Sequence, residues 1–186
     1  MPVSTLDIVN AALDLIGQGS LTALEEASPL AEKVRRLWPL CLEETLRAHF
    51  WKCASRRVNL NPLAEIPAFG FKRAFALPGD FIRLENTEPR ARVRIEGRTL
   101  LADVNKIAVL YVARLEDSTL YDASLRQCLS LKLAAMMAYG ASASTALAQE
   151  MEVRYRDKLR EARAFDSMEG SGDDPPLSNW AEAKLR

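Results

Sequence analysis

The hydrophobic period of the sequence changes within residues 47–60, and this change divides the chain into two kinds of structure. Before it, apolar residues recur at helical spacing; after it, they alternate or form short runs bounded by Pro and Gly, as in strands. The aromatic residues Phe50 and Trp51 stand at the change, and Trp38 precedes them. We interpret all three as hinge and core packing, because they share the apolar face that carries the leucines.

The sequence on both sides of the change predicts an α+β fold, mainly a bundle of about four helices. We expect residues 1–54 and 115–168 to form this helical body. Ser4 is placed to cap the first helix, and Ser28 followed by Pro29 is placed to begin the second.

Three further features describe the helices. Pro39, inside the second helix, predicts a kink or, alternatively, two helices that meet at Trp38. The nearly all-apolar run 129–139 predicts a central, buried helix. From about Ser142 to Ser167, a narrow apolar stripe on a charged helix predicts an outer position or packing against a neighbouring subunit.

Residues 55–114 predict an inserted, antiparallel β module. Breakers such as Pro78-Gly79-Asp80 separate its runs, and Glu96-Gly97-Arg98 is typical of a tight hairpin. The candidate strands are Ser55–Leu60, Phe71–Leu77, Phe81–Thr87, Arg92–Glu96, Thr99–Ala102 and Ala108–Ala113.

Composition limits the possible functions. Lys and Arg equal Asp and Glu at 25 each, so the chain as a whole lacks the cationic excess that wraps nucleic acid. Three scattered Cys residues in apolar surroundings indicate reduced thiols in a cytosolic protein. The N-terminal segment predicts a helix rather than a signal peptide, and no apolar run reaches membrane-spanning length, so no membrane partner is expected.

No pattern in the chain indicates an enzyme, and we expect no cofactor and no metal. The single His49 lies between Cys41 and Cys53, but this spacing is not that of a metal knuckle. There is no phosphate-binding glycine loop after a strand and no nucleophile elbow. An enzyme of unfamiliar type, with a polar pocket near His49 or near residues 90–98, remains an open hypothesis.

Two segments are candidates for binding a partner. Arg90, Arg92, Arg94 and Arg98 form either a solvated hairpin or a surface that faces DNA or an acidic partner. Residues 169–186 begin as a Gly/Pro linker and then carry three sticky residues, which we expect to dock on a partner with the Trp as anchor: Leu177, Trp180 and Leu185.

Four stretches, in this order, resemble the tail tubular protein A family, the head-to-tail adaptors of short-tailed bacteriophages. They are VNAALDLIG (9–17), LRAHFWKCASRR (46–57), FALPGDFIRL (75–84) and LYVARLED (110–117). The resemblance covers roughly residues 4–167. One departure is Phe50, where the family often has Pro between His and Trp.

The resemblance implies a structural protein of the virion, present in the host cytoplasm during assembly. Such adaptors form a homo-oligomeric ring of twelve copies between the portal protein and the tail nozzle protein. DNA passes through the ring without sequence-specific binding. The alternative that we keep is a cytosolic α+β protein-binding module that recruits a partner through its C-terminal tail.

Overall fold

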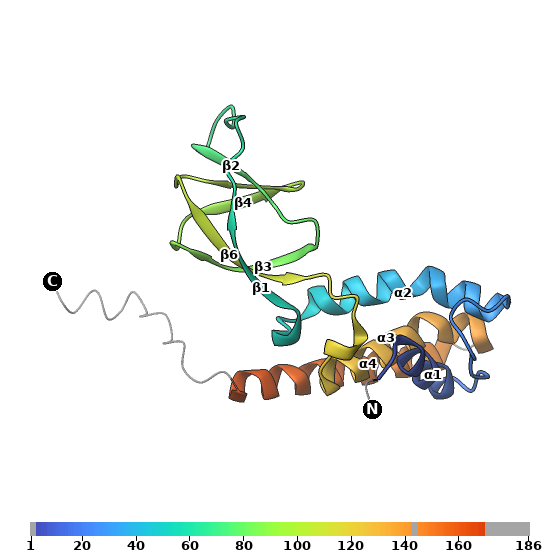
Figure 1. Cartoon of the computed structure of the whole chain (residues 1–186). Coiled ribbons are helices and arrows are strands. Elements are labelled where there is room, and N and C mark those ends of the chain that lie inside the picture. The colour runs from blue at the N-terminus through green and yellow to red at the C-terminus, as the bar shows by residue number, and fades with distance from the viewer. Residues whose placement is uncertain (1–2, 143–144, 170–186) are drawn as a thin grey trace.

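The structure is a computed structural model of the chain and describes residues 3–142 and 145–169. It confirms the α+β class: a helical body lies beneath a module of two small antiparallel sheets (Figure 1). Within the described residues the elements, in chain order, are α1 Thr5–Leu15, α2 Pro29–Ala48, η1 Lys52–Ala54, β1 Ser55–Leu60, β2 Arg73–Ala76, β3 Phe81–Glu88, β4 Val93–Glu96, β5 Thr99–Ala102, β6 Ile107–Ala113, η2 Ser118–Leu120, α3 Ala123–Ser142 and α4 Thr145–Glu169.

Both helix starts that the serines predict are present. The Asp7 backbone N–H donates to Ser4 Oγ at 3.2 Å, while the Ser4 backbone N–H donates to the Asp7 carboxylate at 2.8 Å, which completes a capping box. Ser28 Oγ accepts from the Ala31 backbone N–H at 3.2 Å and caps α2.

α2 is one helix that continues through Pro39, so the alternative of two helices meeting at Trp38 is wrong. The reason is packing on both sides of the proline: Val34 before it and Leu42 after it are both buried in the same core. Pro39 itself is exposed, so its ring lies outside this core.

α3 is the centre of the helical body, as the apolar run predicts. It packs against α1, α2 and α4. Leu125, Leu129, Leu133 and Met137 are at most 1% exposed. α4 covers α3 with the predicted stripe, in which Met151, Tyr155, Leu159 and Ala162 are buried.

The β module consists of two three-stranded sheets around one apolar core. In the first sheet β6 lies between β1 and β3, and in the second β5 lies between β2 and β4. Side chains from both sheets share this core: Leu60, Phe75, Leu77, Leu100, Ile107, Val109 and Tyr111. The module therefore has its own core, separate from that of the helices.

Trp51 forms the joint between the two parts. Its side chain is 1% exposed, its Nε1 donates to the Thr45 carbonyl at 2.8 Å, and its ring meets that of His49 edge-on at 4.9 Å. α2 ends at Ala48, after which His49 adopts extended backbone angles and the chain turns through η1 into β1. The indole thus holds the last turn of α2 against the start of the module.

Arginine side chains fasten the same joint from outside. Arg47 at the end of α2 donates to the Ile82 carbonyl of β3 at 3.0 Å, and Arg83 returns a bond to the Arg47 carbonyl at 3.2 Å. Arg163 of α4 donates to the Ala48 carbonyl at 2.6 Å. The unpaired carbonyls at the end of α2 are therefore used to attach β3 and α4.

Truncation of the joint tests its contribution to stability. Trp51→Ala leaves a cavity, so the free energy of unfolding should fall by about 3–5 kcal/mol. Trp51→Phe keeps most of the ring but loses the bond to Thr45 and should cost about 1–3 kcal/mol. Urea denaturation followed by circular dichroism measures both.

The matched control is Val153→Ala on α4, where the side chain is 54% exposed. It should change the free energy of unfolding by about 0.5 kcal/mol or less. Equal losses for Trp51→Ala and Val153→Ala would show that the joint carries no special part of the stability.

Candidate partner-binding surface

The second sheet separates the hairpin arginines. Residues 92, 94 and 96 alternate onto one face around β4, where Arg92 and Arg94 line an open groove. Arg98 lies in the turn beyond, after Gly97 with φ 58°, and donates to the Pro78 carbonyl at 2.5 Å. It lines a different hollow together with Glu43 of α2. Arg98 therefore does not share the groove that Arg92 and Arg94 line.

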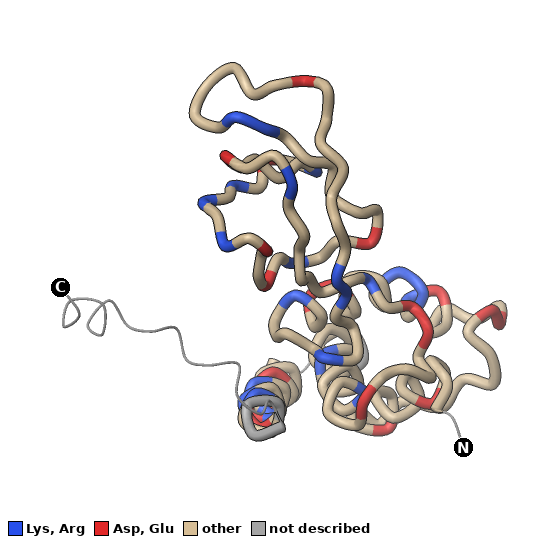
Figure 2. Tube along the Cα trace, turned by 60° about the vertical axis from the view of Figure 1, so that its left-hand side comes forward, with Lys and Arg blue, Asp and Glu red and all other residues tan. Residues whose placement is uncertain are grey.

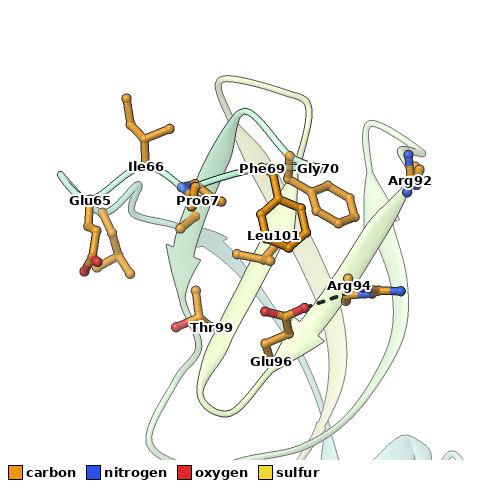
Figure 3. A pocket seen from close by; sticks show the side chains of 14 residues that line it. Glu65, Ile66, Pro67, Phe69, Gly70, Arg92, Arg94, Glu96, Thr99 and Leu101 are labelled. Carbon is orange, nitrogen blue, oxygen red and sulfur yellow. Dashed lines mark ion pairs between the residues drawn. The ribbon is translucent and has the colours of Figure 1, made fainter.

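The groove on the outer face of the second sheet, called here the tip groove, has a volume of about 660 Å³ (Figure 3). Its lining falls into three groups. The loop before β2 gives one wall, with Leu63, Ile66 and Phe69. The floor is formed by Phe71, just before β2, together with Ala74 of β2 and Leu101 of β5. The other wall is formed by β4 and the residue before it, with Arg92, Arg94 and Glu96.

The loop wall of the tip groove exposes large apolar side chains. Phe69 is 87% exposed, Ile66 60% and Leu63 39%. Single exposed apolar residues are ordinary, but several along one wall of one groove are typical of an interaction surface. The floor beneath them is apolar too, since Phe71, Ala74 and Leu101 form a small buried cluster.

The opposite wall of the tip groove is cationic and accessible. The Arg92 guanidinium lies 4.9 Å from the centroid of the Phe71 ring. Arg94 meets Glu96 at 3.7 Å, but both side chains are more than half exposed, so this pair holds Arg94 only weakly. Both arginines can exchange their present contacts for a carboxylate.

The module carries a charge that the neutral total conceals. Residues 55–114 contain eleven Lys and Arg against six Asp and Glu, a net charge of +5, and the remainder of the chain carries −5 (Figure 2). The strand register gathers part of this charge: Arg73 of β2 and Val93 of β4 both lie opposite Ala102 of β5, so Lys72 and Arg92 come to the same end of the second sheet. The positive charge of the module is therefore visible only when residues 55–114 are considered apart from the rest of the chain.

A second apolar groove, of about 480 Å³, lies between α1 and α3 and is called here the body groove. Its apolar lining includes Ile8, Ala11 and Leu131. Arg126 and Arg154 stand at its margin. Like the tip groove, it combines an apolar lining with two arginines.

The remaining predicted site residues lie as follows. Trp38 and Phe50 are half-buried and pack against the helical core, and Trp51 is buried within it. Arg90 is exposed in the loop between β3 and β4. The residues predicted for tail docking lie outside the described part of the chain: Leu177, Trp180 and Leu185.

The thiols beside His49 have separate partners. Cys41 Sγ donates to the Leu129 carbonyl at 3.5 Å, and Cys53 Sγ donates to the Asp122 carboxylate at 3.4 Å. Over residues 3–142 and 145–169, no group of three His, Cys, Asp or Glu residues is placed to hold a metal ion.

A scan against models of known protein families finds no match for this chain, and no curated protein sequence matches it. In the described helices, no segment combines the length and the apolar character that crossing a membrane requires.

Thiol chemistry gives a prediction. Burial raises the pKa of Cys41 and Cys128 to about 12 and that of Cys53 to about 11. Because the thiolate is the reactive form, alkylation of the native protein at pH 8 should be slow at all three. Half-buried Cys53 should react first, at a rate that rises about tenfold per pH unit up to pH 10.

Mass spectrometry after iodoacetamide treatment measures the order of labelling. Cys41 and Cys128, both 0% exposed, should become labelled only when denaturant is added. Labelling of either at the rate of Cys53 in the native protein would contradict the packing described for α2 and α3.

Proposed function

We propose that this protein is a head-to-tail adaptor of a short-tailed bacteriophage, a structural subunit whose copies form a ring between portal and tail nozzle. The observation that carries the proposal is the division of the chain into a helical body and a β module that projects from one end of it (Figure 1). A ring subunit needs contacts to its neighbours and separate contacts to the components above and below. The two parts offer distinct surfaces for these contacts.

α4 supports the lateral contact in this proposal. Its inner stripe packs on α3, while its outer side exposes Val153 at 54% and Phe165 at 52%. Charged side chains surround them, with the i,i+4 ion pairs Glu150–Arg154 at 4.0 Å and Glu152–Arg156 at 3.1 Å. Such a side can pack on a different face of the next copy, and a head-to-tail contact of this kind closes into a ring when its rotation closes.

The β module supports contacts to other components of the particle. Its net charge of +5 favours an anionic partner surface, and its tip groove favours apolar side chains. Neutrality of the whole chain agrees with a channel through which DNA slides without sequence-specific binding. On this proposal the protein works in the virion and is present in the host cytoplasm during assembly.

The tip groove also favours a second candidate function, a cytosolic α+β module that binds a protein partner. Such a module would use the exposed Phe69 and its neighbours without forming a ring. The two candidates differ in whether this protein assembles with the portal protein of the same genome.

Sedimentation velocity tests the adaptor proposal. The purified protein alone should sediment as a small species, and mixing with portal protein should give a ring-sized complex that contains both, because a template adds up weak contacts between copies. A small, fixed oligomer that ignores the portal would contradict the adaptor proposal and favour the binding module.

A variant pair tests the lateral contact. Val153→Asp places a charge on the outer side of α4 and should lower the ring fraction about tenfold or more, because an unpaired charge would enter the interface. Leu120→Asp changes a side chain of similar exposure, 56%, in η2 and should leave the ring fraction unchanged. Equal effects of the two variants would place the lateral contact elsewhere.

A further inference from the structure

The lining of the tip groove suits a ligand that is acidic at one end and apolar beyond it. One wall offers the guanidinium groups of Arg92 and Arg94, which bind carboxylates well. The other wall offers Ile66 and Phe69, both of which are mainly exposed to water. Figure 3 shows the loop residues on one side of the hollow and the arginines on the other.

A nucleic acid fits this groove less well than a peptide. Base stacking needs a series of aromatic faces, whereas Leu63 and Ile66 are aliphatic. Glu65 and Glu96 also line the groove and would repel phosphates along its length. A short peptide with two carboxylates brings fewer negative charges past these glutamates than a run of phosphates does.

The chain itself contains a segment of this chemistry. Residues 173–180 read Asp-Asp-Pro-Pro-Leu-Ser-Asn-Trp, two acids followed by two prolines and then by Leu177 and Trp180. Proline-rich segments dock in aromatic-lined grooves at low entropic cost because they are already extended. The order of acidic and apolar residues matches the two walls of the groove.

We propose that the tip groove binds residues 173–180 of a neighbouring copy of this chain. Asp173 and Asp174 pair with Arg92 and Arg94, and the residues from Pro175 onward cover Phe69 and the other apolar side chains of the loop wall. Each copy then gives its C-terminal tail to one neighbour and receives a tail from another. Such a contact is head-to-tail and is compatible with a closed ring.

The reach of the chain favours a neighbour over the same copy. α4 ends at Glu169, four residues before Asp173, and four residues span at most about 14 Å. Arg98 lies at the base of the module, where it lines a hollow with Glu43 of α2. Arg92 precedes β4, at the opposite end of that strand from the turn, and the second sheet is the part of the module farthest from the helical body (Figure 1). Because α4 ends in the helical body beneath the module, the acids of the same copy start far from Arg92, whereas those of a neighbour can approach it from outside (Figure 1).

Disulfide trapping between two full-length chains tests this proposal. One chain carries Ala68→Cys at the tip groove, and the other carries Ser178→Cys, so that Phe69, Leu177 and Trp180 are all retained. Only a contact between two copies can join these cysteines. In a glutathione redox buffer, we expect the mixed dimer to form about tenfold or more faster than the Ser178→Cys homodimer, because docking raises the effective concentration of the two thiols.

The matched control moves the first cysteine to the body groove. Ala11, like Ala68, is an exposed alanine that lines an apolar groove. A chain with Ala11→Cys should form a disulfide with the Ser178→Cys chain no faster than the Ser178→Cys homodimer forms. A wild-type chain mixed with Ser178→Cys corrects for the natural cysteines.

Charge reversal separates recognition from a loss of folding. Arg92→Glu with Arg94→Glu, added to the Ala68→Cys chain, should slow trapping about tenfold or more. Asp173→Lys with Asp174→Lys, added to the Ser178→Cys chain, should restore the rate with the reversed groove. A merely misfolded module would not be rescued by a change in the other chain.

Four results would overturn the proposal. The first is faster trapping of Ser178→Cys by Ala11→Cys than by Ala68→Cys. The second is a disulfide that forms only within one chain when that chain carries both Ala68→Cys and Ser178→Cys. The third is that Asp173→Lys with Asp174→Lys does not restore trapping by the reversed groove, and the fourth is inhibition of trapping by a single-stranded oligonucleotide that binds the protein with or without Asp173 and Asp174. This proposal takes one point from the proposed function, namely that copies of the chain lie side by side. Trapping is measured without portal protein, so its failure leaves the adaptor proposal standing, and failure to assemble on the portal leaves the trapping result standing.

Discussion

The attachment of the end of α2 to the β module is the interaction on which the rest of this structure depends. A helix end leaves carbonyl groups without partners, and here those groups receive Trp51, Arg83 and Arg163. Trp51 directly precedes η1, Arg83 belongs to β3, and Arg163 belongs to α4. The end of α2 is therefore bonded to three other parts of the chain. Trp51 is also 1% exposed within the helical core, so a turn of the module about its base would disturb the packing of this ring.

This joint connects two parts that each have a core of their own. The helical body is built around α3, whose apolar side chains are covered by the other three helices. The module needs no helix for its own core, since its two sheets cover one another. Its outer face, with Phe69 and the arginines beside the tip groove, is therefore open to a partner. An assembly subunit that must hold neighbours and also reach other components can use this arrangement.

Signals between residues close in sequence predict most of the helices and strands. The features that the sequence does not predict depend on contacts between residues far apart in the chain. Ser4 and Ser28 begin helices because their hydroxyls bond to nearby amides, and β1 begins and ends where the sequence pattern predicts. The separation into two sheets was not predicted, because pairing of β1 with β6 depends on residues far apart in the chain. The arginines of residues 90–98 were found, but the groove was not, since Leu63, Ile66 and Phe69 lie in a loop without periodicity. The charge of the module was hidden by the neutral total.

Electron cryomicroscopy of the complex formed with portal protein tests the central claim, that this chain is a ring-forming adaptor, most directly. The account predicts a closed ring of copies beneath the portal, with the outer side of α4 against a neighbour and with peptide density in each tip groove that continues from the next copy. Copies bound singly, or a complex in which α4 and the β module both face solvent, would contradict it.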